Sequence, residues 1–458
     1  MDLDDPGPIP TQTDIKKVCS LLATDIRKLN SLKKEDETEF HTLCQSILES
    51  TKKLEELTEI DGFSLVLFGS DLYPFINSLI SIPDTEISAI FLSILTDLSE
   101  KTENIERLIK EKYIITAIKN AESIDEINIQ SDAQYLYSIF NLISTIIDGC
   151  EEPKAFIDSF IKDTILLKLI ERQFQRDDFD QNVLAASELL AIILQSNTST
   201  IALIDDGFIN LILRFCANMH TTKQAEEDEA ASNAFNIVII LAMDPVTVKI
   251  LANLGVVDIL LQCTGSSSHK TEKSSALLAY NALDACLSTL PLCCEQFVDA
   301  DGIQKVFGLL GNQSLKKNFE FLSNVISIID SLLSSLQKDS TQMKRVLRKF
   351  QEKDYEKMNI WIKLTEYLFK NVNFEEEDQS NSDIFDTFLQ CCSSISILMY
   401  LLPNEAKVEL ASKINESMVI DYQLVIDSAL ELLEQSPNIK DRVEGGIKII
   451  ELLCKSDE

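Results

Sequence analysis

The amino-acid sequence predicts an all-α fold assembled from stacked helical units, and three features of the sequence indicate this architecture. The chain of 458 residues contains only 12 Gly and 10 Pro, which argues against a strand-rich or disordered chain. Apolar residues recur at helical spacing in stretches free of Gly and Pro, as in residues 183–194. Corners that end short helices recur at similar intervals. Repeated layers of this kind form one continuous core, because each layer packs on its neighbours.

One such unit is clearest in residues 180–216. Its apolar spacing predicts a long helix over residues 183–194, followed by a polar break whose Ser and Thr suit a helix cap. A short apolar helix over residues 201–204 ends at Gly207, where we expect the left-handed backbone that Gly tolerates. A third helix then begins at Phe208. A unit of this kind cannot bury its apolar face alone, so it requires copies on either side.

Equivalent corners recur along the chain. They are Asp71, Lys112, Thr164, Gly207, Gly255 and Gly302. Their successive spacings are 41, 52, 43, 48 and 47 residues. This spacing is typical of armadillo and HEAT repeats, whose period is about 40–47 residues. The sequence therefore predicts an armadillo/HEAT-type right-handed superhelical solenoid with helical N- and C-terminal caps.

The same features divide the chain into four predicted segments. These are a disordered lead-in at residues 1–13, an N-terminal helical cap at 14–61, an armadillo-type repeat array at 62–350, and a C-terminal helical cap or bundle at 351–458. The N-terminal segment has charged outer faces, which a solenoid cap needs for solubility. We expect four helices in the last segment, over residues 384–402, 405–414, 422–433 and 442–453. Association of two copies through this bundle is an alternative that the sequence leaves open.

The net charge of the chain restricts the kinds of molecule that it can bind. The chain has 74 Asp and Glu against 41 Lys and Arg, a formal net charge of −33. Such a surface repels nucleic acid and anionic membranes, so we expect no direct binding to either, and it attracts basic protein segments. The alternative is that the acid only keeps a Leu-rich solenoid soluble. The longest apolar runs fall short of the roughly 20 residues that a membrane span needs.

The sequence offers little support for catalysis, a metal site or a cofactor. Its three His residues, His41, His220 and His269, form no known metal-binding motif, and neither a phosphate-binding loop nor a nucleophile-elbow motif occurs. The 11 Cys show no disulfide framework, which favours a reducing, intracellular compartment. We therefore predict a protein that is not an enzyme.

Several segments, in order along the chain, resemble the beta-catenin-like protein 1 family of nuclear armadillo proteins. They are residues 84–98, 188–197, 274–277, 297–299, 331–333 and 345–357. The last segment, Arg-Val-Leu-Arg-Lys-Phe-Gln-Glu-Lys-Asp-Tyr-Glu-Lys, is the most distinctive. The resemblance covers roughly residues 40–368 and is looser over the C-terminal bundle.

This resemblance implies a non-enzymatic scaffold of the spliceosome-associated nineteen complex, which acts in pre-mRNA splicing in the nucleus. It also implies binding to basic segments, similar to nuclear-localisation signals, of the Myb-related core subunit of that complex and of other splicing factors. Better-known family members begin with a charged tail that carries a basic import signal. This chain begins close to the predicted cap, so we expect import on a partner. The alternative is a cytoplasmic armadillo adaptor in nuclear transport or chaperone regulation.

Four polar residues on the predicted long helices are candidates for holding a partner segment: Asp97, Asn141, Glu188 and Asp284. In armadillo arrays the third helix of each unit lines a concave groove. Asp97 and Asn141 fall where that pattern often places a groove Asn, two residues before the helix ends. Asn can bond both N–H and C=O of a bound chain, and carboxylates accept from Lys or Arg. For each position the alternative is an ordinary solvent-facing polar residue.

Overall fold

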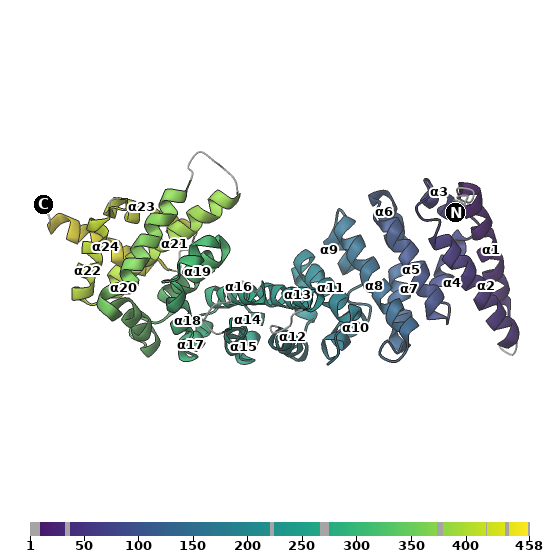
Figure 1. Ribbon diagram of the computed structural model, residues 1–458, viewed down its shortest axis with the longest axis horizontal. Coiled ribbons are helices and arrows are strands. Elements are labelled where there is room, and N and C mark those ends of the chain that lie inside the picture. Colours follow the sequence, from purple (N-terminus) through teal and green to yellow (C-terminus); the bar gives the residue numbers. More distant parts are fainter. Residues whose placement is uncertain are drawn as a thin grey trace, which may run out of the picture. The chain divides into compact units, whose positions relative to one another are not determined.

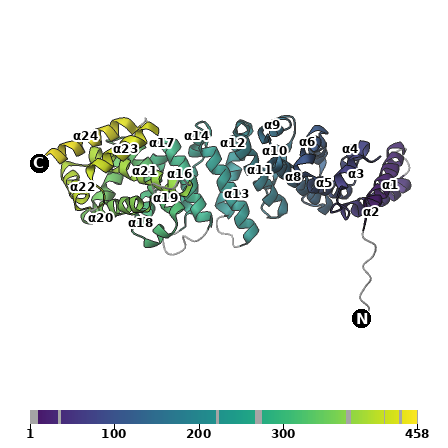
Figure 2. The same ribbon diagram turned by 90° about the horizontal axis from the view of Figure 1, so that it is seen from above.

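The computed structural model (Figures 1 and 2) describes residues 10–32, 37–219, 224–265, 274–372, 379–417, 419–435 and 439–456. Regular structure within those ranges is helical throughout, and no β-strand occurs in them. The chain divides into two compact units. Unit 1 comprises Met1–Leu211 with Ala225–Asn233, and unit 2 comprises Ile212–Gln224 with Ala234–Glu458. The predicted all-α fold class is confirmed.

Unit 1 opens with a pair of amphipathic helices, α1 (Gln12–Ser31) and α2 (Glu37–Glu55). They pack on each other and bury apolar residues such as Leu22 and Ile47, while their charged residues, except the buried Asp25, lie on the outer sides. Residues 1–9 of the predicted lead-in lie outside the described residues. The four domain boundaries inferred from sequence stay predictions.

The rest of unit 1 repeats a pattern of short helices followed by a long one. The elements are α3 (Phe63–Phe68), η1 (Tyr73–Phe75), α4 (Ile76–Ile80), α5 (Thr85–Ser99), α6 (Thr102–Lys110), α7 (Tyr113–Asn120), η2 (Ala121–Ser123), α8 (Gln130–Gly149), α9 (Pro153–Asp158), α10 (Leu166–Phe174), α11 (Gln181–Ser196) and η3 (Thr198–Leu203). The long helices α2, α5, α8 and α11 pack in succession, as Figure 1 shows. Helices α12 (Asp206–Met219) and α13 (Ala225–Ala242) each contribute residues to both units.

Unit 2 continues the same alternation. Its elements are α14 (Thr247–Asn253), α15 (Val256–Cys263), α16 (Ser274–Thr289), α17 (Pro291–Asp299), α18 (Gly302–Leu309), η4 (Gln313–Lys317), α19 (Phe319–Ser335), α20 (Thr341–Asn371), α21 (Gln379–Leu401), α22 (Asn404–Glu416), α23 (Tyr422–Gln435) and α24 (Lys440–Ser456). Helices α16, α19 and α21 pack in succession, and α21 also contacts α20, α23 and α24. The four helices expected after residue 384 are present as α21 to α24.

Helix α21 is the buried centre of this C-terminal part. Its segment Ser382–Leu401 is long and apolar enough to cross a membrane by length and composition, with a mean hydropathy of 1.4. The expectation from apolar runs missed this segment, because Asp386 and Gln390 interrupt its apolar residues while its average hydropathy stays high. However, 72% of that segment is buried within the protein, and residues such as Ile395 and Leu398 are fully enclosed. The physical reason is that a helix packed on several others must be apolar nearly all round.

A helix follows four of the six predicted corners, whereas Gly207 and Gly302 lie within the first turn of a helix, and the backbone conformations of the corners differ. Lys112 and Gly255 are left-handed, with φ of 57° and 78°. At the sixth corner the left-handed residue is Asp301, just before Gly302. The prediction for Gly207 is wrong, because α12 already begins at Asp206 and contains it. The Asp205 carboxylate accepts from the Phe208 amide at 2.8 Å, so a side-chain cap starts this helix.

A further left-handed corner divides α20. Lys353, Asp354 and Tyr355 have φ of 54°, 56° and 60°, so α20 is two helices joined by a turn. The turn lies in the segment 345–357 that is the most distinctive part of the family resemblance. It is followed by a helix and then by the long helix α21, which is the order seen after the earlier corners.

Candidate protein-binding face

Seven of the long helices, drawn from both units, contain no Lys, Arg or His. This holds for α5, α8, α11, α13, α16, α19 and α21, although the chain has 41 Lys and Arg. Each of these seven helices has at least one Asp or Glu. A requirement for solubility alone would be met by acid and base together, so the exclusion of cations from one type of helix points to a surface with a specific charge.

In unit 1 this charge lies on the exposed stripes of three adjacent helices. Glu86 and Asp97 are exposed on α5, and Glu188 is exposed on α11. On α8 the exposed residues Asn141 and Asp148 are seven apart and therefore share one side of the helix. We call the exposed side of α2, α5, α8 and α11 the long-helix face of unit 1. Three of the four predicted candidates, Asp97, Asn141 and Glu188, lie on it.

The position of Asn141 within its helix differs from the prediction. Asp97 does lie two residues before the end of α5 at Ser99. Asn141 lies eight residues before the end of α8 at Gly149, because Leu142, Ile143, Ile146 and Ile147 continue the helix as buried residues. Asn141 is consequently near the middle of its exposed stripe.

Asp97 and Glu188 on this face have acidic neighbours, and no described cation among the groups that shift their pKa balances them. Partial burial raises the pKa of Asp97, and the carboxylates of Glu100 and Glu59 raise it further, against a hydrogen bond from Thr58. Partial burial also raises the pKa of Glu188, and the nearby Glu229 and Asp148 add to this effect. A raised pKa means that the charged form is disfavoured by its surroundings. A bound cation would relieve this cost.

Sequence reasoning missed the neighbours that form these acidic groups. Glu55 of α2 lies near Asp97, and its pKa is raised by partial burial and, among its acidic neighbours, chiefly by Asp97. Asp148 and Glu229 lie near Glu188. These pairs join residues 40 or more positions apart, and periodicity within one helix does not report them. Only the repeat period of 41–52 residues could have indicated these neighbours, because residues one period apart lie on adjacent long helices.

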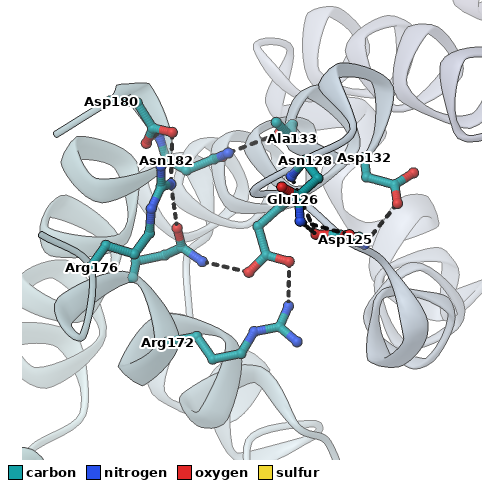
Figure 3. Close-up of polar contacts among 10 residues, drawn as sticks. Asp125, Glu126, Asn128, Asp132, Ala133, Arg172, Arg176, Asp180 and Asn182 are labelled. Carbon is teal, nitrogen blue, oxygen red and sulfur yellow. Dashed lines mark hydrogen bonds and ion pairs between the residues drawn. The ribbon is translucent and has the colours of Figure 1, made fainter. Parts of the chain in front are cut away.

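A buried network fixes the spacing of these helices (Figure 3). Glu126 is buried in the connection between α7 and α8, where its carboxylate accepts from Arg172 at 2.8 Å and from Gln173 at 3.0 Å. Arg176 pairs with Asp180 at 2.7 Å, and Asp180 caps the start of α11. Glu126 therefore holds α10 in place. Arg176, just after α10, holds the first turn of α11 through Asp180.

Hydrogen bonds also join the loop before α8 and the start of α11 to α5 and α8. Asp132 accepts from Thr85 at 2.6 Å and from the Asp125 amide at 2.8 Å. Asn182 of α11 donates to the Ala133 carbonyl at 3.1 Å, as Figure 3 shows. Because these contacts join the first turns of α5, α8 and α11, the exposed stripes of the three helices are held in register.

The fourth candidate, Asp284, has a different environment. It lies on α16 in unit 2, where its Oδ1 is shielded from solvent and accepts no hydrogen bond from a described residue. Burial raises the pKa of Asp284 to about 7, with a contribution from Asp330, against a hydrogen bond from Ser327. Burial also raises the pKa of Asp330 to about 6, although its carboxylate accepts from Ser394 at 2.6 Å. Asp284 is thus part of an interhelical polar layer.

We expect this layer to make the stability of unit 2 depend on pH. A carboxyl whose pKa is raised on folding contributes stability below its unfolded pKa of about 4, and this is lost as pH rises through its folded pKa of about 7. Asp284→Asn removes the ionisation. At about pH 8 it should raise the free energy of unfolding by about 1–3 kcal/mol relative to the natural chain, and at about pH 4 the difference should vanish. Urea unfolding at both pH values measures this, and an equal difference at both would contradict it.

The described residues present no obvious catalytic or metal centre. Within the described ranges no group of three or more His, Cys, Asp or Glu could hold a metal ion. His220 and His269 lie outside the described residues. Burial raises the pKa of the thiols of Cys263 and Cys294 to about 12, which disfavours the reactive thiolate.

Comparison with known proteins gives consistent matches. The model of a family described as "Catenin-beta-like, Arm-motif containing nuclear" matches residues 47–387. Beta-catenin-like protein 1 of Rattus norvegicus is 27% identical over 280 residues, which are 58% of this chain and 47% of the rat protein. The Schizosaccharomyces pombe homolog is 23% identical over 399 residues, 81% of this chain and 66% of that protein. The chain thus spans about half to two thirds of these relatives.

Solved structures agree on the fold. The crystal structure of SYS-1 gives a TM-score of 0.62 at 13% identity, covering 96% of this chain and 80% of that chain. A chain from a study of the phosphorylation switch between cadherin and beta-catenin gives 0.59 at 10% identity, covering 94% and 77%. Such identities show the fold alone, and the fold is of the armadillo type that the repeat period predicts.

Proposed function

Because the chain belongs to the family described as catenin-beta-like, Arm-motif containing and nuclear, we propose that it is a nuclear scaffold of the spliceosome-associated nineteen complex. The family supports the general role of a protein-interaction scaffold, which is typically non-catalytic. The partners in this proposal are Lys/Arg-rich segments of splicing proteins, with the Myb-related core subunit of the complex as the first candidate. Unit 1 would hold such a segment on its long-helix face.

One observation carries the proposal: seven of the long helices, α5, α8 and α11 of unit 1 among them, have acids and no cations. A single exposed ion pair contributes roughly 0–1 kcal/mol, so useful affinity requires several pairs along the face. Carboxylates at Asp97 and Glu188, each with an acidic neighbour, supply such a series within unit 1. Asn141 lies on α8, between the helices that carry these two acids, and its amide can bond to the backbone of a bound segment.

Two measurements test this proposal. A labelled octapeptide of alternating Lys and Arg should bind the full chain, and raising NaCl from about 50 mM to about 500 mM should weaken binding at least about tenfold, because salt screens exposed charges. A matched octapeptide with Gln in place of each Lys and Arg should not bind. Affinity that is absent or insensitive to salt would overturn this mode of binding.

Purification of the chain with its partners from native extract tests the cellular role. Recovery of nineteen-complex subunits would support the scaffold proposal. Recovery of importins or chaperones without splicing factors would instead favour a cytoplasmic adaptor in transport or chaperone regulation.

A further inference from the structure

Lys52 of α2 reaches helix α5, which has no cation of its own. Its Nζ lies 2.8 Å from Oε1 of Glu86 on α5. The described residues of unit 1 form five ion pairs, and in this pair alone the acidic residue lies on α5, α8 or α11. The side chains of Lys52 and Glu86 are 51% and 47% exposed, so solvent and other molecules can reach the pair.

The pair borders a cavity of about 440 Å³ between α2, α5 and α8. The lining residues are Lys52, Glu55, Glu56, Glu86, Ala89, Ile90, Ser131 and Gln134. Ala89 and Ile90 provide an apolar surface, and the three Glu residues provide carboxylates beside it. This combination suits an aliphatic stem that ends in a cationic group, which is the shape of a Lys or Arg side chain.

We propose that Lys52 is an intramolecular competitor, whose ammonium group occupies the place that a Lys or Arg side chain of a bound basic segment takes beside Glu86. This inference rests on the proposed function, since it concerns the same face. When the segment binds, its cation pairs with Glu86, and Lys52 swings into solvent, where its ammonium is fully hydrated. The exchange costs little because the original pair is half exposed. Lys52 therefore lowers the affinity of the face for any segment whose cation takes the place beside Glu86.

The neighbouring Lys53 provides a matched control. It is exposed on the same helix and forms no ion pair with the residues that the structure describes. Lys52→Gln and Lys53→Gln change the net charge of the chain equally. Lys52→Gln should tighten binding of the Lys/Arg octapeptide about two- to fivefold at low salt, since it removes both a charge and a competitor. Lys53→Gln should tighten it less than about twofold, through long-range repulsion alone.

A double variant assigns the gain to Glu86. In Lys52→Gln/Glu86→Gln the acid is gone, so the gain should disappear and affinity should fall to that of the natural chain or below. If the natural chain binds the peptide but Lys52→Gln and Lys53→Gln behave alike, the competitor role is overturned and the proposed function is untouched. If neither the natural chain nor any variant binds, the proposed function itself fails. Thermal unfolding of each variant checks that these surface changes leave the fold intact.

Discussion

Changing Asp97 and Glu188 together to Lys is expected to weaken binding of the Lys/Arg octapeptide about 30- to 100-fold at low salt. Each change removes an attractive carboxylate and adds a repulsive ammonium on the long-helix face. Both side chains are exposed, so Lys can be accommodated without displacing the core. Fluorescence anisotropy of the labelled peptide measures the affinity. The loss should shrink when salt is raised, because screening weakens attraction and repulsion alike.

Two further variants separate local from global electrostatics. Glu103 and Glu106 are exposed on the short helix α6, and changing both to Lys alters the net charge by the same amount. This control should weaken binding by less than about threefold, since α6 is not one of the helices that form the long-helix face and its exposed charges are screened by salt. Asp97→Asn with Glu188→Gln should give an intermediate loss. If the α6 variant matches the Asp97 and Glu188 variant, binding depends on net charge and the long-helix face has no special role.

Asp284 is left out of this variant for a structural reason. The sequence suggested one role for Asp97, Glu188 and Asp284, since each is an acid on a predicted long helix. The structure shows a shielded Oδ1 in Asp284, so Lys there would bury an unpaired charge and test folding instead of binding. Whether an acid is exposed depends on how adjacent helices approach, and that information is absent from the spacing of residues within one helix.

The fold itself could be predicted because it depends on local patterns repeated many times. Apolar residues at helical spacing define each helix, and the recurrent corners define each layer. The conformation of a given corner was less predictable. Gly255 is left-handed as expected, yet Lys112 and Asp301 adopt the same conformation without being Gly, and Gly207 does not adopt it. At Gly207 a competing cap from Asp205 starts the helix earlier. The hydrogen bond between Asp205 and Phe208 thus decides where this helix begins, and Gly207 does not end the preceding one.

Gly446→Ala is expected to lower the free energy of unfolding of unit 2 by about 3 kcal/mol, at the upper end of the range for overpacked sites. Gly446 lies on α24, buried against α21. A methyl group there would come within 2.5 Å of the Ser396 carbonyl carbon and closer still to its oxygen. The obstructing atoms are backbone atoms of a buried helix, so no side-chain rotation can relieve the clash. Helix α24 would have to move away and expose Val443 and Ile450.

Gly308 supplies the control for this substitution. It is exposed on α18, and an added Cβ would meet nothing within 4 Å. Gly308→Ala should therefore raise the free energy of unfolding by about 0.5–1 kcal/mol, because Ala restricts the unfolded chain and favours helix. Urea unfolding followed by circular dichroism measures both variants. Hydrogen exchange of α24 shows whether this helix detaches first. Equal effects of the two substitutions would mean that helix propensity, and not the approach of α24 to α21, decides the outcome at Gly446.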